Sequence, residues 1–331
     1  MLSSSAGRAM VLALAVCCAL TPVEAAAQAL DYPNRAVTFV VPFAPGGSTS
    51  IIARILSQKL EQRLGKPFVV ENRPGSGGMI AVSQVAHGTP DGYTIMMASS
   101  TALAINVNVR KQMPYNPRSD ITPIALIARM PYALVVNPDL PVRSVADLVK
   151  LAKDKPGQLS FASVGPGTIH HLNAELFKST FGLDIVHVPY KGTAPALQDV
   201  VGGHVPFMFS DVPPTRALIA GGKLRALGVT TRQRVPALSN VPPLAEVGIP
   251  DFDTASWHSI STAAGVPKPI VDRLATELRV IMADAEVQKM LSDEGAIPQI
   301  SPSPEEFKKF VDAEIVRWGE LVKKAGILHS Q

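Results

Sequence analysis

The feature that most constrains this chain is a repeated junction in which an apolar run is followed by a glycine-rich turn and then by a helix. The clearest example is FVVPFAPGGSTSIIAR, residues 39–54. Similar junctions occupy residues 74–78, 163–168 and 189–193. Alternation of buried strands with helices predicts an α/β fold with mostly parallel sheets flanked by helices. The turns would then gather at the carboxyl edge of a sheet, where open α/β folds bind ligands.

The residues of these turns suit an anion. The first turn of a helix carries free N–H groups and a partial positive charge. Glycine lets the backbone approach a ligand closely, and Ser and Thr hydroxyls add donors. Gly46-Gly47-Ser48-Thr49 has this composition, yet no turn contains a phosphate-binding Gly-x-x-x-x-Gly-Lys-Ser/Thr motif. The pattern predicts a small carboxylate as the ligand and predicts no nucleotide cofactor. A plain strand–helix connection is the alternative for any single turn.

The hydrophobic pattern places further elements along the chain. Short apolar runs predict strands at residues 37–42, 68–70, 93–98, 133–136, 159–162, 185–188, 205–209 and 224–229. Helical spacing predicts helices at 50–64, after Gly75, and at 144–153, 168–181, 193–201, 267–291 and 303–324. Ser144 and Ser303 are the expected N-caps, and Trp318 is expected to pack the last helix onto the body. Residues 129–131 and 248–253 are expected hinges.

The N-terminus predicts export. Arg8 precedes an apolar stretch at residues 9–20, and the small residues at 25–29 offer a cleavage site, so residues 1–29 are predicted to form a cleaved signal peptide. Cys17 and Cys18, the two cysteines of the chain, lie inside this segment. A lipid anchor at Cys17 is disfavoured because Val16 precedes it. The exported chain would have neither disulfide nor thiol chemistry, and we expect it in the periplasm.

Composition excludes several classes of function. Lys and Arg number 31 against 27 Asp and Glu, a net charge of +4, and the basic residues do not cluster, which argues against nucleic acid. His170 and His171 are adjacent, so both rings cannot reach one metal ion from one helix, and no metal site is predicted. The chain has no Gly-x-Ser-x-Gly elbow. Asp211 ends an apolar strand, where it would contact a ligand amine or hydroxyl, or cap the next turn.

Several motifs together resemble a known family. They are VPFAPGGSTSIIAR, VENRPGSGGMIA, PDGYTIMMASS, HVPYKGTAPALQDVVGGHVPFMF, GKLRALGVTT and NVPPLAEVGIPDF, in this order. The sequence is similar over nearly its whole length after residue 30 to the solute-binding receptors of tripartite tricarboxylate transporters, also called the Bug family.

The resemblance implies a two-domain periplasmic-binding-protein fold, type II-like, that closes on a ligand in the manner of a Venus flytrap. Domain 1 would comprise residues 30–130 and 250–331, and domain 2 residues 131–249. Such receptors bind small carboxylates, pass them to a membrane permease and are not enzymes; we expect a monomer without a cofactor. The implied ligand-binding residues are Phe43, Gly46, Gly47, Ser48, Thr49, Ser50, Ser99, Thr101, Ser163, Gly167, Thr168, His170, Tyr190, Lys191 and Asp211.

The sequence departs from the family pattern at two positions. Ser50 stands where the family usually has Asp, and Met79 stands where it often has Asn. Either change could alter ligand preference, so the resemblance names no ligand. Two other functions stay open. The chain could sense its ligand for a two-component signalling system, or it could be an exported hydrolase with Ser163, His170 and Asp211 as candidate catalytic residues.

Overall fold

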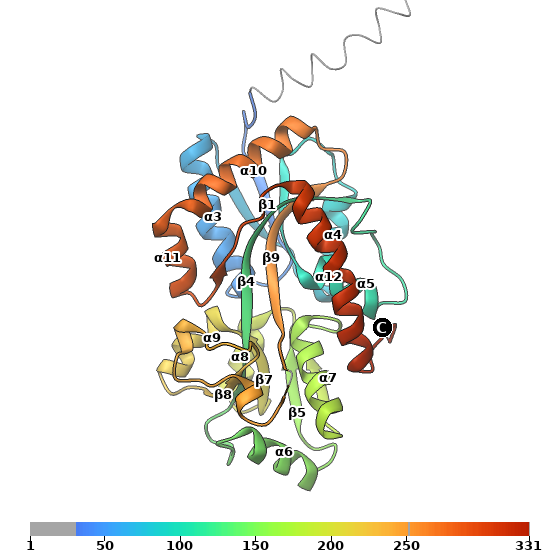
Figure 1. The fold of residues 1–331 in the computed structure, drawn as a ribbon, viewed down its shortest axis with the longest axis vertical. Helices are drawn as coiled ribbons and strands as arrows, with labels where there is room; N and C mark the ends of the chain where they lie inside the picture. The colour runs from blue at the N-terminus through green and yellow to red at the C-terminus, as the bar shows by residue number, and fades with distance from the viewer. Residues whose placement is uncertain (1–30, 251, 331) are drawn as a thin grey trace, which may run out of the picture.

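A computed structural model describes residues 31–250 and 252–330. The predicted signal peptide therefore lies outside the described residues. The elements form an upper and a lower lobe (Figure 1). The upper lobe contains β1 (Val37–Val41), α3 (Ser48–Leu64), β2 (Phe68–Asn72), α4 (Met79–Ala86), β3 (Thr94–Ser99), α5 (Asn106–Val109), α10 (Lys268–Ala283), α11 (Ala285–Asp293), β10 (Ile297–Pro298) and α12 (Pro304–Lys324).

The lower lobe follows the same alternation of strand and helix. It contains α6 (Val145–Asp154), β5 (Ser160–Ser163), α7 (Ile169–Phe181), β6 (Val186–Pro189), α8 (Thr193–Val201), β7 (Phe207–Asp211), α9 (Val212–Ala220) and β8 (Arg225–Val229). Two long strands, β4 (Ile121–Val136) and β9 (Ala255–Ala263), run between the lobes. Short helical turns occupy Ser76–Gly78, Thr101–Ile105, Pro236–Leu238 and Leu244–Glu246.

The strands form one mixed sheet in the order β2-β1-β3-β9-β4-β7-β5-β6, and β8 and β10 also pair with β4. Pairing is parallel within each lobe, between β1 and its neighbours and between β5 and its neighbours. It is antiparallel wherever β4 or β9 takes part. The α/β prediction is confirmed, but the expected mostly parallel sheet is mixed because two crossing strands run against the rest.

Strand β4 joins the lobes. Its first part, Ile121–Pro131, pairs with β9, and its last part, Tyr132–Val136, pairs with β7 and β8. The expected hinge at residues 129–131 lies inside this continuous strand. The expected hinge at 248–253 lies in the connection that leads to β9, where Asp251 is outside the described residues.

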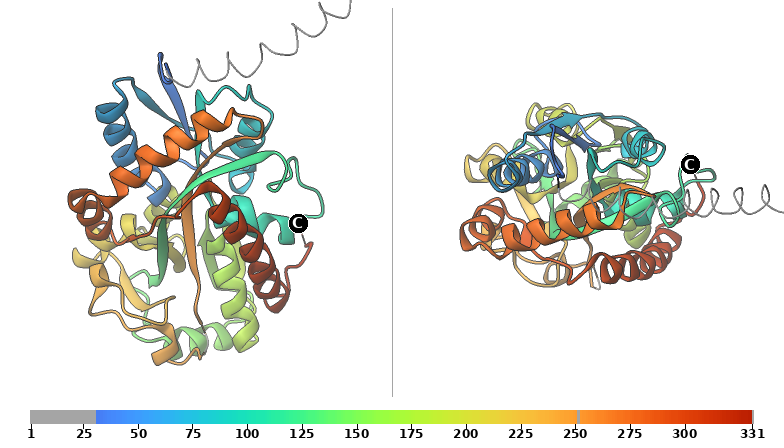
Figure 2. Two further views of the ribbon diagram at one scale, coloured as in Figure 1. Left: turned by 45° about the horizontal axis from the view of Figure 1, so that its top comes forward. Right: turned by 90° about the horizontal axis from the view of Figure 1, so that it is seen from above.

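The helices cover both faces of the upper sheet. Seen from above, α3 lies on one side of the strands, and α10 and α12 lie on the other (Figure 2). Glu314 of α12 accepts hydrogen bonds from Trp257 Nε1 at 2.7 Å and from Trp318 Nε1 at 2.8 Å. Trp318 is fully buried, so the last helix packs through it as expected. The predicted helix 267–291 is two helices, because Asp284 ends α10 and caps α11 through Glu286 N.

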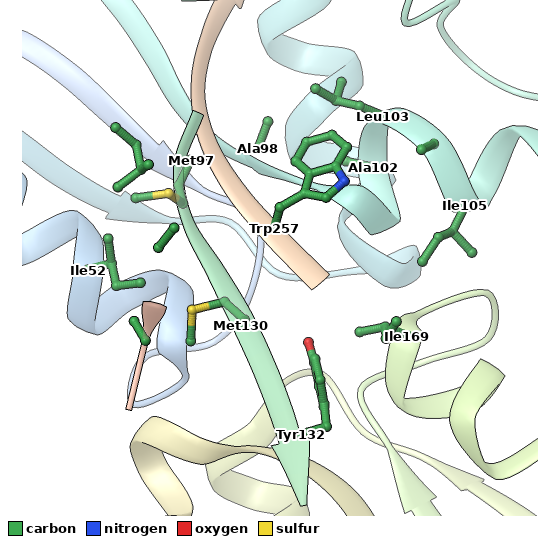
Figure 3. Packing of buried hydrophobic residues seen from close by; sticks show 14 of the residues in the cluster. Ile52, Met97, Ala98, Ala102, Leu103, Ile105, Met130, Tyr132, Ile169 and Trp257 are labelled. Atoms are coloured by element: carbon green, nitrogen blue, oxygen red, sulfur yellow. The ribbon is translucent and has the colours of Figure 1, made fainter. Parts of the chain in front are cut away.

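One hydrophobic core extends from the upper lobe into the lower. Figure 3 shows it running from Leu103 and Trp257 to Tyr132 and Ile169 at the level where the lobes meet. A second, smaller cluster lies in the lower lobe between its sheet and helices α8 and α9. Apolar packing therefore continues from one lobe to the other beside the crossing strands, next to the candidate site.

Candidate functional site

The site is a small cavity between the lobes. Its volume is about 20 Å³, roughly the space that a water molecule needs. Thirteen residues line it: Phe43, Ser48, Thr49, Ser99, Thr101, Tyr132, Val164, Ile169, His170, Thr193, Asp211, Ser256 and His258. None of these lining residues is Lys or Arg. Any anion held here would therefore be bound by hydroxyl groups, helix N-termini and histidine.

The upper wall is the start of α3. Gly47 is the N-cap residue, with extended dihedral angles (φ −89°, ψ 170°). Ser48 and Thr49 form the first helical turn and are each 4% exposed. The N–H of Ser48 points across the cleft and donates to Asp211 Oδ2 at 3.0 Å. The predicted anion-binding turn therefore does hold a carboxylate, but one that the protein itself supplies.

The Asp211 carboxylate is in hydrogen-bond contact with residues of three helices, α3, α7 and α8. Its Oδ1 accepts a hydrogen bond from Thr193 Oγ1 at 2.9 Å and lies 3.0 Å from His170 Nε2. It is the N-cap residue of α9, but its side chain does not cap that helix. Burial alone would raise the pKa of Asp211, yet the hydrogen bond and charge of His170, followed by the Ser48 donor, bring the pKa well below its usual value. The carboxyl group is therefore ionised, and the predicted capping role is wrong.

The remaining wall comes from the crossing strands. Tyr132 of β4 packs edge-on against the His170 ring, with centroids 5.0 Å apart. Ser256 and His258 lie on β9. Burial lowers the pKa of His258 to about 4; the charge of Asp211 opposes this shift, and the smaller effect of His170 adds to it. His258 is therefore neutral near pH 7. Neither residue was predicted, because ASWHSISTA carries no strong strand signal in the sequence.

Three buried polar atoms at this cavity have no hydrogen-bond partner within residues 31–250 and 252–330. They are Ser99 Oγ, His170 Nδ1 and His258 Nδ1. Buried polar atoms in proteins are nearly always paired, since leaving one unpaired costs about 1–3 kcal/mol. Unpaired groups from β3, α7 and β9 that lie around one cavity are typical of a site that binds a polar ligand.

Six of the predicted site residues line the cavity itself besides Asp211: Phe43, Ser48, Thr49, Ser99, Thr101 and His170. Gly46 and Gly47 lie beside it, and a Cβ on either would meet Ala194 or Thr193 of the lower lobe at 3.1 or 3.3 Å. Thr193 also lines the cavity; it was predicted as part of the glycine-rich junction at 189–193 and not as an individual ligand-binding residue.

The other predicted residues are near the cavity but do not line it. Ser50 is buried and accepts a hydrogen bond from Asn72 Nδ2 at 2.6 Å. Tyr190 donates to Asp199 Oδ2 at 2.5 Å, within the lower lobe. The Lys191 side chain is exposed, and only its carbonyl reaches the upper lobe, where it accepts from Ala44 N at 3.3 Å. Met79, the second departure from the family pattern, packs against the core.

The turn before α7 satisfies its own donors. Gly165 N donates to Ser163 Oγ at 3.0 Å, and Gly167 N donates to His171 Nδ1 at 3.3 Å. Thr168 Oγ1 donates to the Gly165 carbonyl at 2.7 Å. Ser163, Gly167 and Thr168 therefore build a rigid turn behind the cavity.

The three candidate hydrolase residues belong to two separate hydrogen-bonded pairs. Ser163 Oγ lies 2.6 Å from His187 Nε2, whereas His170 pairs with Asp211. Among the described residues no hydrogen bond joins Ser163 to His170, so the three do not form the relay that nucleophilic catalysis needs. Residues 31–250 and 252–330 contain no group of three or more His, Cys, Asp or Glu that could hold a metal ion. Over the same part of the chain, no helix is long and apolar enough to cross a membrane.

Comparison with known proteins identifies the family. The model of the tripartite tricarboxylate transporter family receptor matches residues 52–327. The chain belongs to this receptor family. It is 34% identical over 305 residues to Protein BugT of Bordetella pertussis (strain Tohama I), covering 92% of this chain and 93% of BugT. The predicted membership of the Bug family of solute-binding receptors is confirmed.

Two solved structures show the same fold with a ligand. R. palustris Rpa4515 with adipate is 40% identical, has a TM-score of 0.87, and the match covers 90% of this chain and 99% of that one. MatC (Rpa3494) from Rhodopseudomonas palustris with bound malate is 31% identical, has a TM-score of 0.84, and the match covers 88% and 100%. The predicted periplasmic-binding-protein fold is confirmed by these receptors.

Proposed function

We propose that this receptor captures a small carboxylate in the cavity between its lobes and delivers it to the membrane components of a tripartite tricarboxylate transporter. The observation that carries the proposal is the cavity at the start of α3, which is lined by Ser99, His170 and His258, each with a buried polar atom that has no hydrogen-bond partner among the described residues. Hydroxyls, a helix N-terminus and histidine suit a carboxylate without a lysine or arginine. The adipate and malate named for the two solved receptors support the same chemistry.

The proposed ligand contacts are the predicted residues that line the cavity, together with Tyr132, Thr193, Ser256 and His258. The lobes would be the two moving domains, with boundaries near residues 130 and 250, where β4 and β9 cross. A cavity of about 20 Å³ is smaller than a dicarboxylate, so a ligand of that size would enter a more open cleft and close it.

We further propose that the protein works in the periplasm as a monomer, after removal of residues 1–29, and that it binds its ligand without converting it. The separation of Ser163 from His170 supports the last point. Incubation with adipate, malate and their methyl esters, followed by NMR, would test it. Turnover that disappears in His170→Ala would overturn the binding-only role.

Calorimetric titration of the exported chain, residues 30–331, tests the proposed ligand class. Adipate and malate are compared with their neutral diamides at equal concentration. Binding of a diacid but not of its diamide is the expected result, because the site is built for a charged oxygen. Equal binding of acid and amide, or binding of neither, would overturn the carboxylate proposal for these ligands.

Paired threonine variants then locate the site. Thr49→Val removes a hydroxyl at the cavity, and affinity should fall about tenfold, the usual worth of a hydrogen bond to a charged group. Thr122→Val removes a hydroxyl at the far end of β4, outside the cavity, and affinity should not change. Equal affinity of both variants and the original protein would place the ligand elsewhere.

A further inference from the structure

Within residues 31–250 and 252–330, hydrogen bonds join the lobes at several places, among them Ser179 Oγ to the Lys324 carbonyl at 3.2 Å and the ion pair of Arg216 with Glu294 at 2.9 Å. Three others involve the glycine-rich turns. Ala44 N donates to the Lys191 carbonyl at 3.3 Å, and Arg110 Nη2 donates to the Pro166 carbonyl at 2.9 Å. The third runs from Ser48 N to Asp211 Oδ2 at 3.0 Å. The first two end on neutral carbonyls. The third ends on a carboxylate, so it is the one in which a helix N-terminus meets a full negative charge.

The burial and charge of Asp211 strengthen the Ser48–Asp211 hydrogen bond. Its side chain is 1% exposed, and its donors come from both lobes: Ser48 from the upper, His170 and Thr193 from the lower. Hydrogen bonds to an ionised, buried acceptor are about twice as strong as neutral ones. The partial positive charge at the start of α3 adds to the attraction. His170 and Thr193 of the lower lobe hold the carboxylate in place in the open form, before α3 approaches it on closure.

Opening the cleft would remove one of these donors. The pair His170 and Thr193 would stay with Asp211, since all three belong to the lower lobe, but Ser48 would leave with α3. The open form must then hydrate the Asp211 carboxylate and the Ser48 N–H separately. The closed form avoids that cost with a bond that needs no ligand.

We propose that Asp211 is a positioning residue that draws the start of α3 onto the lower lobe and thereby holds the cleft closed without a ligand. The inference rests on the proposed function only in that closure is the movement that captures the ligand. A ligand that enters must first break the Ser48–Asp211 bond, and closure over the ligand forms it again. Asp211 thus sets the ratio of closed to open forms in the ligand-free receptor, the equilibrium that the ligand shifts when it binds.

The exported chain offers a direct test, because both cysteines precede residue 30. Gln62→Cys on α3 and Lys150→Cys on α6 place spin labels at exposed positions of the two lobes. Electron–electron distance measurement on the ligand-free protein then reports the ratio of closed to open forms. The measurement does not depend on which ligand the receptor binds.

Two independent variants remove the bond. Asp211→Asn removes the charge at constant size. Ser48→Pro removes the N–H donor, and it suits this position because Ser48 is the first helical residue and Gly47 is extended. Each should lower the closed-to-open ratio about tenfold or more, and the double variant should add little.

Matched controls separate closure from folding. Asp199→Asn removes a carboxylate of the same lobe that accepts a hydrogen bond from Tyr190 of that lobe, and Ser48→Ala removes the hydroxyl but keeps the N–H. Both should keep the short lobe distance. Folded Asp211→Asn and Ser48→Pro proteins with unchanged distances would overturn the inference. A receptor that closes through Asp211 but binds neither adipate nor malate would instead count against the proposed ligand class.

Discussion

Two glycine-rich turns, one from each lobe, look alike in sequence but use their backbone donors differently. At the start of α3, Ser48 N donates to the opposite lobe. In the turn before α7, Gly165 N and Gly167 N donate to Ser163 and His171 of their own lobe. The first turn is therefore built for a contact that forms on closure. The second is held by hydrogen bonds within its own lobe.

The largest expected effect concerns the histidines behind the rigid turn. Burial, followed by the charges of His187, Lys178 and Arg110, lowers the pKa of His171 to about 3, and burial lowers that of His187 to about 4. Between pH 6.5 and about 4 the unfolded chain binds more protons, so stability should fall as pH falls. His171 alone contributes a slope of about 1.4 kcal/mol per pH unit.

Urea denaturation at intervals of half a pH unit would measure this slope. His171→Asn keeps an acceptor near the position of Nδ1 but removes the titration, so its slope should be smaller by about one proton. Val316→Ala, at an exposed position, changes no titratable group; it is the control and should keep the original slope. An unchanged slope in His171→Asn would mean that the rigid turn does not depend on a neutral imidazole.

The next prediction compares one glycine from each turn, because the two glycines differ in backbone conformation. Gly167 has φ +78°, and a Cβ there would lie 2.8 Å from Asn106 Oδ1. Gly167→Ala should therefore lower the free energy of unfolding by about 2 kcal/mol. Gly47→Ser lies at an extended N-cap position that favours serine, but its Cβ would lie 3.3 Å from Thr193 Oγ1, so the loss should be smaller, about 1 kcal/mol or less. Chemical denaturation of both variants checks the difference, and equal losses would contradict it.

A smaller effect is expected where the rigid turn meets the upper lobe. Arg110→Met removes the bond to the Pro166 carbonyl but keeps the apolar part of the side chain. This bond has a charged donor but a neutral acceptor, and the guanidinium is partly exposed, so it should contribute about 1.5 kcal/mol and its loss should lower the closed-to-open ratio about tenfold, no more than in Asp211→Asn. The same spin-label pair measures it. A larger loss than in Asp211→Asn would reverse the ranking of the two turns.

The smallest effect is predicted for Lys191. Its side chain is exposed and the lobe contact uses its carbonyl, so Lys191→Gln should change neither stability by more than about 0.5 kcal/mol nor carboxylate affinity. Calorimetric titration with adipate or malate, whichever binds, checks this. A tenfold loss of affinity would show that the side chain reaches the ligand after all.

The sequence predicted most elements within one or two residues, because each lobe alternates strands and helices with clear local signals. Two strands were misread for physical reasons. In β4, Pro123 and Pro131 interrupt the apolar run, so only its last four residues were predicted. In β9, small and hydroxyl residues hide a strand that is buried throughout. Its burial comes from β3 and β4 on either side, which no local pattern records.

The candidate site divides in the same way. The turn chemistry of Gly46–Thr49 and the presence of His170 and Asp211 near strand ends could be predicted, since helix N-termini and strand ends have local signals. Which of these residues form hydrogen bonds with one another could not be predicted. His258 and Tyr132 reach the cavity only because β9 and β4 cross between the lobes.

By itself, then, the sequence determined the alternating architecture, the family and the kind of donors at each turn, because these follow from residue spacing along the chain. Only the tertiary structure decided which donors meet. Ser48 and Asp211 are 163 residues apart in the chain, and the bond between them depends on how two lobes pack. A hydrogen bond is sensitive to changes of a few tenths of an ångström in its donor–acceptor distance. That distance is set by the packing of the whole core rather than by neighbours in sequence.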